Sequence, residues 1–241
     1  MINSHIQALE KLEIIMKKAF NYIKENIGKV SELDVERFIL SEFKKQGLVS
    51  DKNCPIVAVN KNTSNVHYFL NKKTNKIIKK NDLILIDIWA RLKKKGSVYA
   101  DITWMGYAGK KASKKIEQTL KMVINGRDIG VDFIKKQLKK GKIPKGNEVD
   151  KIIRDFFKDN KLDEFFKHST GHCLGKYHCH GKGFKLSRKY NKELKTNFPF
   201  TIEPGLYFKD DFGVRSEINC YIDTNKNLIV LGEVQKDMFR F

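Results

Sequence analysis

The feature that most constrains this chain is the segment 81–103, which places two carboxylates in strand-like, apolar surroundings. The run Leu83–Ile86 predicts a buried strand that ends at Asp87, and a second predicted strand carries Asp101. A lysine-rich run with one glycine lies between them and predicts a hairpin loop. Two buried acids close in space repel each other unless one stays protonated or a cation lies between them. On this segment alone, a hairpin with one capping and one solvent-facing aspartate is an equally good interpretation.

A second segment, residues 198–221, repeats this arrangement near the other end of the chain. An apolar, β-prone run leads to Glu203, a turn-rich stretch follows, and a further strand-like run carries Glu217. The two acids are fourteen positions apart in each segment. A duplicated hairpin of this kind predicts two halves that face each other, with four carboxylates converging on one site. Such a cluster is not tolerated at neutral pH without cations.

The length and hydropathy of the chain fit one globular domain. Its 241 residues are enough for a sizeable core, and 41% of them are hydrophobic. The longest apolar runs are much shorter than a bilayer span, and the first residues lack the basic and apolar regions of a signal peptide. We therefore expect a cytoplasmic protein without membrane contact. Four well-separated cysteines with no CxxC motif indicate reduced thiols.

The net charge of +20 raises nucleic acids and anionic membranes as partners. The lysines, however, are spread over nearly every segment and do not gather in one stripe. Such dispersion is more typical of a solvated surface than of a binding patch. We therefore expect no specific nucleic-acid partner.

Hydrophobic periodicity predicts amphipathic helices around the two acid-bearing segments. Ser31, with Asp34 three residues later, predicts the start of the second helix, and Gly47 predicts its end. The helices are expected at residues 6–26, 31–47, 113–125, 131–140 and 148–158, and a short strand at residues 55–60. No Pro-, Gly- and Ser-rich linker divides the chain. We predict one α+β domain with pseudo-twofold symmetry, in which helices cover the outer face of a curved, mainly antiparallel sheet.

The segment 168–183 contains four of the six histidines and two of the four cysteines. A structural zinc site could use Cys173, Cys179 and two histidines, but the usual spacing of paired ligands is missing. A polar loop with hydrogen-bonded histidines would carry no chemistry. The interpretation we favour is that one histidine completes the carboxylate cluster while another faces a substrate, because the acid pairs call for a nitrogen donor nearby.

Five motifs in a fixed order make the chain resemble the pita-bread metallopeptidases. The motifs are LIDIWA with Asp87, YADIT with Asp101, STGHCLG with His172, FTIEPG with Glu203 and GVRSEIN with Glu217. This family includes methionine aminopeptidase, aminopeptidase P, prolidase and the metal-free creatinase, and the resemblance covers nearly the whole chain. It implies a pita-bread fold and a single catalytic domain over residues 1–241, without the N-terminal domain that aminopeptidase P and prolidase carry.

The resemblance also implies two divalent metal ions and a role for each ligand. Asp87 would bind one ion, and His172 with Glu203 would bind the other. Asp101 and Glu217 would bridge both. A hydroxide that bridges the ions would attack the scissile carbonyl, and Glu203 would act as the proton shuttle. A carboxylate-rich ligand set favours manganese or cobalt, with iron or zinc as alternatives.

The family places a second catalytic histidine seven residues after the metal-binding histidine. Cys179 holds that position here, between His178 and His180. A bulge of one residue between Gly175 and His180 would turn His180 toward the metals and leave His178 at the periphery. His67, in the motif VHY, resembles the substrate-facing histidine of aminopeptidase P and prolidase. His67 and His180 would then stabilise the tetrahedral intermediate.

The motifs GVRSE and VHY resemble the proline-handling branch of the family, which makes Arg215 a substrate-binding candidate beside His67 and His180. We therefore expect a two-metal aminopeptidase or dipeptidase that hydrolyses Xaa-Pro-like peptide substrates. A methionine aminopeptidase, which has a similar length, is the alternative within the family. A non-catalytic pita-bread module that binds RNA, a ribosome or another protein is the alternative from another class, although such modules tend to lose metal ligands that are all present here. The oligomeric state stays open, with a homodimer as one option.

Overall fold

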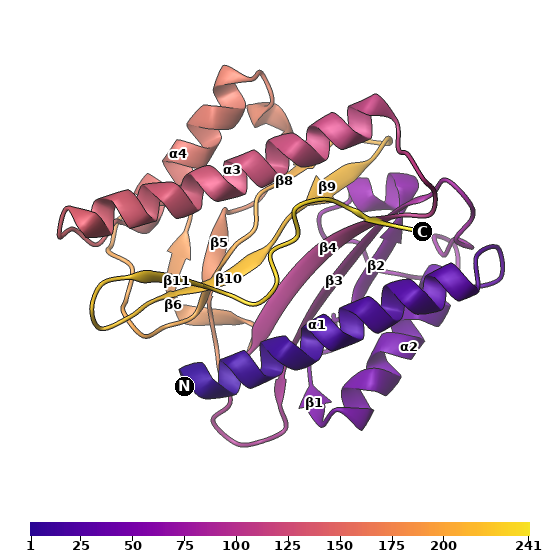
Figure 1. The fold of residues 1–241 in the computed structure, drawn as a ribbon, viewed down its shortest axis with the longest axis horizontal. Helices are drawn as coiled ribbons and strands as arrows, with labels where there is room; N and C mark the ends of the chain where they lie inside the picture. The colour runs from indigo at the N-terminus through magenta and orange to yellow at the C-terminus, as the bar shows by residue number, and fades with distance from the viewer.

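Two helix pairs and two curved sheets form the two halves of the chain (Figure 1), and the structure, a computed structural model, describes residues 1–241. The helices are α1 (Ile2–Glu25), α2 (Glu32–Lys45), α3 (Lys114–Lys139), α4 (Gly146–Asp159) and the short 3-10 helices η1 (Asn60–Ser64) and η2 (Asp163–Phe165). The strands are β1 (Leu48–Val49), β2 (Ile56–Val59), β3 (Leu83–Leu92), β4 (Ala100–Tyr107), β5 (Gly171–Leu174), β6 (His180–Leu186), β7 (Phe200–Ile202), β8 (Gly205–Tyr207), β9 (Gly213–Arg215), β10 (Ile218–Ile222), β11 (Leu228–Leu231) and β12 (Phe239–Arg240).

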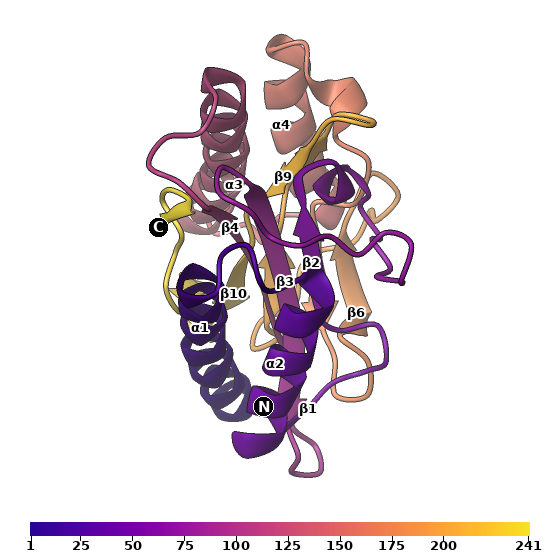
Figure 2. The same ribbon diagram turned by 90° about the vertical axis from the view of Figure 1, so that its right-hand side faces the viewer.

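The strands pair into two five-stranded sheets and one two-stranded ribbon. The first sheet has the order β1-β3-β4-β12, with β2 also paired to β3, the second has the order β11-β10-β7-β5-β6, and β8 pairs with β9. All pairs are antiparallel except that of β12 with β4. In Figure 2, α1 and α3 lie on one side of β3 and β4, and β6 lies on the other. The predicted α+β class, with helices outside a curved and mainly antiparallel sheet, is confirmed.

Strand alternation in the hairpin of β3 and β4 turns its two aspartates away from the core under α1. Successive residues of a strand point to opposite faces of the sheet. Ile84, Ile86 and Ile88 pack with residues of α1 and α2 in a core cluster of 25 buried residues. The alternate positions, which include Asp87 in β3 and Asp101 in β4, lie on the opposite face. One strand pair therefore builds both the core under α1 and an acidic surface behind it.

The sequence analysis was wrong to end the first acid-bearing strand at Asp87. β3 continues to Leu92, because its last residues still have partners on both sides. Ala90 pairs with β4, and Leu92 pairs with Leu48 of the short strand β1. Asp87 thus lies in the middle of a paired strand, where its backbone is fixed from both directions. The predicted hairpin loop is confirmed between β3 and β4.

The sequence analysis was also wrong to expect two helices where α3 runs unbroken from Lys114 to Lys139. Gly126 and Gly130 lie in or beside the predicted gap between the two helices, where glycine is unfavourable because it costs roughly 1 kcal/mol in a helix interior. Both glycines lie where α3 meets α4. A Cβ at Gly126 would come within 2.8 Å of the Phe157 ring, and one at Gly130 within 2.6 Å of the Ile153 side chain. The glycines therefore permit close helix packing and do not end a helix.

The other helices begin and end close to their predicted positions. Ser31 caps α2 as expected, because its hydroxyl accepts the backbone N–H of Asp34 while the Asp34 carboxylate accepts the backbone N–H of Ser31. None of the helices combines the length and the apolar character that crossing a bilayer requires.

Asn219 joins the two sheets where β4 and β10 lie next to each other (Figure 1). Its side-chain amide donates to the carbonyl oxygen of Asp101 at 2.6 Å, and its Oδ1 accepts the backbone N–H of Asp101 at 3.3 Å. The side chain thus takes the place of a strand partner across the joint. It also fixes Asp101 of the first half beside Glu217 of the second, since Glu217 lies just before β10.

Unfolding should depend on pH through His5, which is fully buried in α1. Its Nδ1 lies 2.7 Å from the Tyr99 carbonyl oxygen, which can only accept, so Nδ1 carries the proton. Burial lowers the pKa of His5 from 6.5 to about 4. The unfolded chain therefore binds the proton at a higher pH than the folded chain does. The contribution of neutral His5 to the free energy of unfolding is full above pH 6.5 and falls by about 3 kcal/mol as the pH drops to 4.

Denaturant titrations of the native chain and of His5→Asn would measure this effect, since the asparagine amide keeps the donor to Tyr99 but does not titrate. The free energy of unfolding of His5→Asn should lose less on acidification than that of the native chain. Parallel pH profiles for the two proteins would contradict the assignment.

Candidate active site

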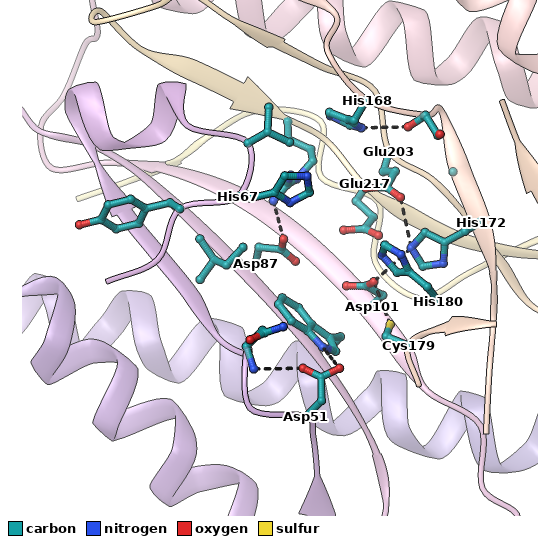
Figure 3. Close-up of a pocket in the computed structure, with 18 of the residues that line it drawn as sticks. Asp51, His67, Asp87, Asp101, His168, His172, Cys179, His180, Glu203 and Glu217 are labelled. Atoms are coloured by element: carbon teal, nitrogen blue, oxygen red, sulfur yellow. Dashed lines mark hydrogen bonds and ion pairs between the residues drawn. The ribbon is translucent and has the colours of Figure 1, made fainter. Parts of the chain in front are cut away.

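A pocket of about 530 Å³ lies on the acidic face of the β3–β4 hairpin, between the two halves of the chain. Figure 3 shows side chains of both halves pointing into it. The pocket brings together every site residue that the sequence analysis proposed, namely Asp87, Asp101, His172, Glu203, Glu217, His67, His180 and Arg215.

Three of the carboxylates form the centre of the pocket. Asp87, Asp101 and Glu217 are buried, and each offers an oxygen that lies within 4.8 Å of the others. Asp87 Oδ1, Asp101 Oδ1 and Glu217 Oε1 have no hydrogen-bond partner, although they are shielded from solvent. A buried carboxylate oxygen without a donor is costly, because desolvation removes the water that stabilised its charge. Three buried carboxylates that offer oxygens this close together, each with one oxygen that lacks a donor, fit a divalent cation.

His172 in β5 and Glu203 after β7 extend this cluster on the side of the second sheet. His172 Nε2 lies 3.3 Å from Glu203 Oε1 and 3.7 Å from Asp101 Oδ2. The other ring nitrogen, Nδ1, lies 3.2 Å from the Cys173 carbonyl oxygen and must donate to it. In the neutral ring Nε2 then presents a lone pair to two carboxylates. That arrangement requires a proton or a metal ion between them.

The pKa values of the pocket acids and of His172 also indicate that the site lacks positive charge. Burial, followed by repulsion from neighbouring carboxylates, holds the pKa of Asp101 and that of Glu217 well above their usual values. Burial also raises the pKa of Glu203 to about 8. Burial and the nearby His180 lower the pKa of His172 to about 3, so this imidazole is neutral at physiological pH. The protein alone therefore does not stabilise the fully charged carboxylate set.

Arg215 in β9 is the buried cation that the chain itself supplies to this cluster. Its guanidinium forms an ion pair with Asp87 and donates to the hydroxyl of Thr103 at 3.0 Å. Thr103 in turn donates to Glu217 Oε2 at 2.8 Å. Each bond occupies one oxygen of a carboxylate and leaves the other oxygen buried and without a partner. Arg215 and Thr103 thus hold two ligand candidates in place without occupying their second oxygens.

The segment around Cys179 differs from the sequence-based expectation in three ways. Gly175 to Cys179 form a turn, closed by a bond from the Gly175 N–H to the Cys179 carbonyl oxygen, so strict strand alternation does not apply. The register shift of the β5–β6 pair lies after His180, not before it. His178 lines the pocket together with His180 and is not peripheral. The expectation that His180 faces the site agrees with the geometry, because its ring lies 3.9 Å from that of His172.

Cys179 contacts the carboxylate cluster directly, which the sequence analysis did not foresee. Its thiol donates to Asp101 Oδ2 at 3.1 Å and is buried. Burial and the negative charge of Asp101 raise the pKa of Cys179 well above its usual value, so the group is a neutral thiol donor. Asp101 therefore receives a donor on one oxygen, as Asp87 and Glu217 do from Arg215 and Thr103.

His67 reaches the pocket from a loop that a buried carboxylate anchors. Glu32, at the start of α2, has no exposed surface. It accepts the backbone N–H groups of Val59 and Lys76, each at 2.8 Å, and the hydroxyl of Tyr68 at 2.9 Å. These bonds tie both ends of the loop, and the residue next to His67, to one helix terminus. The backbone next to the exposed ring of His67 is therefore held in place.

His168 is a further pocket residue that sequence reasoning did not single out. Its Nδ1 lies 2.9 Å from the Ser169 carbonyl oxygen, so its Nε2 accepts the Tyr207 hydroxyl, 2.8 Å away. The Tyr207 oxygen also receives a bond from Arg215 at 3.3 Å. Burial and Arg215 lower the pKa of His168 to about 3, which keeps it neutral. Only the folded chain brings His168 and Tyr207 together, so no local sequence signal marks this contact.

Comparison with known proteins places these features in a family. The model of metallopeptidase family M24 matches residues 5–224 of the chain. A Mycoplasma genitalium protein provisionally named an Xaa-Pro aminopeptidase is 34% identical over 231 residues, which is 93% of this chain and 60% of that protein. A Methanocaldococcus jannaschii peptidase that is otherwise uncharacterised is 33% identical over 224 residues, with 88% and 57% covered.

Solved structures agree with the fold. An X-Pro aminopeptidase from Thermotoga maritima superposes with a TM-score of 0.86 at 23% identity, covering 100% of this chain and 63% of that one. An Xaa-Pro dipeptidase from Bacillus anthracis gives a TM-score of 0.84 at 25% identity, with 100% and 62% covered. The chain thus spans about three fifths of the length of these relatives. It has the pita-bread fold, and it belongs to metallopeptidase family M24.

Proposed function

We propose that this chain carries a two-metal aminopeptidase or dipeptidase activity that releases the first residue of Xaa-Pro peptides. The observation that carries the proposal is the set of three carboxylate oxygens, on Asp87, Asp101 and Glu217, that are buried and without partners. Family membership and the similarity to proteins named for Xaa-Pro peptides support the same conclusion.

Five residues would hold the metal ions. Asp87 would hold one ion and His172 with Glu203 the other, while Asp101 and Glu217 would be ligands shared by both. Manganese or cobalt suits this oxygen-rich set, with iron or zinc as alternatives. Bound divalent ions would supply Lewis acidity, which polarises a peptide carbonyl and makes water a stronger nucleophile.

The remaining pocket residues have roles that follow from their contacts. Glu203 lines the pocket and has one oxygen held by the Thr201 hydroxyl at 3.1 Å, which suits a group that takes up and returns a proton. His180 and His67 would donate hydrogen bonds to the oxygen on which charge develops. Arg215 would hold Asp87 in place and line the substrate side of the pocket.

The metal content should depend on Asp101. After loading with manganese or cobalt and removal of free metal, elemental analysis of the native chain should give close to two ions per chain. Asp101→Asn should lower the metal affinity by at least about 100-fold, because it removes a shared ligand. Chelation should lower the melting temperature of the native chain, because metal binding is linked to folding.

The exposed carboxylate of Asp132 on α3 provides the matched control. Asp132→Asn makes the same chemical change outside the pocket and should leave both the metal content and the chelator effect unchanged. A native chain that binds no metal, or an Asp101→Asn variant with native metal content, would refute the assignment of the site.

The two histidines beside Cys179 should differ in their effect on turnover. His180 contacts His172 and is placed to donate to a substrate, so His180→Ala should lower turnover by about 100-fold while the metal content stays native. His178→Ala is the neighbouring control and should change turnover little, although His178 also lines the pocket. The reverse ranking in steady-state kinetics would show that His178 is the substrate-facing residue.

A small peptide panel tests the proposed substrate class. With metal bound, the native chain should cleave Ala-Pro and Ala-Pro-Ala faster than Met-Ala-Ser or Ala-Ala. A preference for Met-Ala-Ser would favour the methionine aminopeptidase alternative. No cleavage of any peptide by a chain with two bound metal ions would favour the non-catalytic binding module. That the basic surface has no specific nucleic-acid partner stays a prediction.

A further inference from the structure

One carboxylate lines the pocket without belonging to the metal-ligand cluster. The acids of the pocket wall are Asp51, Asp87, Asp101, Glu203 and Glu217, and the last four are the ligand candidates. Figure 3 shows Asp51 apart from that group, at the lower edge of the view. When metal ions neutralise the cluster, Asp51 remains as a free negative charge in the wall.

The position of Asp51 is fixed by two neutral donors. The indole Nε1–H of Trp89 donates to Asp51 Oδ2 at 3.1 Å, and the backbone N–H of Asn53 donates to Asp51 Oδ1 at 3.2 Å. Trp89 is held in turn, because its backbone carbonyl oxygen accepts the Ser50 hydroxyl. No lysine, arginine or histidine forms an ion pair with Asp51. The half-buried carboxylate is therefore oriented but not neutralised.

The surroundings of Asp51 favour an ammonium group as its partner. Trp89, Tyr68 and Phe69 line the same pocket, and Phe69 is 61% exposed. Aromatic faces attract ammonium and guanidinium groups, most strongly in the case of tryptophan. A carboxylate fixed at the edge of an indole, with further aromatic rings nearby, combines the two kinds of group that bind an organic cation.

The free cations of the pocket lie on the other half of the chain. Lys167 and Lys185 line the wall, with Lys167 next to His168 and Lys185 opposite His172 in the β5–β6 ladder. Asp51 lies before β2, in the first half. Asp51 is thus the carboxylate of the pocket wall that has no ion-pair partner and is not a ligand candidate. A peptide carries a matching ammonium group at its first residue.

We propose that Asp51 and Trp89 form the subsite that binds the positively charged group of the first residue of a peptide ligand. The group is an ammonium or guanidinium, supplied either by the peptide amino terminus or by the side chain of a basic first residue. This assignment rests on the proposed function in taking a peptide as the ligand. It adds a carboxylate that binds the first residue of the peptide and is not a metal-ligand candidate.

Equilibrium binding of four small amides to the metal-loaded chain distinguishes the two sources of the cation. Lysinamide carries both ammonium groups, norleucinamide carries only the α-ammonium, Nα-acetyl-lysinamide carries only the side-chain ammonium, and Nα-acetyl-norleucinamide carries neither. Each is titrated by NMR into the native chain and into Asp51→Asn, whose side-chain oxygen still accepts the Trp89 indole N–H. The loss of a charge-assisted hydrogen bond should weaken binding about tenfold.

The pattern of losses gives the answer. A loss confined to lysinamide and norleucinamide assigns Asp51 to the amino terminus, and a loss confined to the two lysine amides assigns it to the side chain. Asp51→Glu keeps the charge and should retain most of the affinity, and added salt should weaken only the charged probes. Asp132→Asn again removes a carboxylate outside the pocket and should have no effect.

Three results would overturn the proposal. They are an unchanged affinity in Asp51→Asn, an equal loss for the uncharged Nα-acetyl-norleucinamide, or no binding of any charged probe to the native chain. Native metal content and melting temperature of Asp51→Asn confirm that the variant is folded. Because the assay measures binding alone, failure of the native chain to cleave Ala-Pro in parallel would reject the proposed function and leave this result intact.

Discussion

The burial of four carboxylates in one pocket is the constraint on which the rest of this structure depends. Desolvation opposes the charged form of each group, and repulsion between the groups adds to that cost. The chain places Asp87 and Asp101 within paired strands and Glu203 and Glu217 beside strand ends, where the backbone cannot relax to separate them. The site can lower this energy only by binding protons or cations, because the rigid strands prevent the carboxylates from moving apart.

The chain supplies a hydrogen-bond donor to one oxygen of each of three carboxylates. Arg215 occupies one oxygen of Asp87, Cys179 one oxygen of Asp101, and Thr103 one oxygen of Glu217. In each case the second oxygen stays buried without a partner. Donors that fix a ligand from behind reduce the reorganisation needed when a metal ion binds. The unsatisfied oxygens are therefore a property of the site and not a packing defect.

The sequence was sufficient to predict which residues meet in the pocket but not all of their contacts. The candidate ligands stand in local motifs, and the equal spacing of the two acid pairs is visible without a structure. Cys179 and His168 were missed or misjudged because their roles depend on partners far along the chain, Asp101 and Tyr207. The predicted break in α3 after residue 125 was wrong because the role of Gly126, close packing against the Phe157 ring on α4, is a tertiary contact. Local sequence patterns predict helices, strands and motifs. They do not predict contacts between elements that lie far apart in the chain, and these errors all involve such contacts.

The two halves contribute equal numbers of acids to the proposed metal site but contribute differently to the proposed substrate contacts. The acids proposed as ligands come in two pairs, one pair from each half, and Asn219 joins the halves where those pairs meet. The groups placed to contact a substrate have no such pairing. His67 stands on a loop of the first half, while Arg215 and His180 belong to strands of the second. A pair of metal ions is nearly symmetric and suits a duplicated framework, but a peptide has a direction. The asymmetric additions are therefore the part of the chain that can select which end of a peptide lies over the metals.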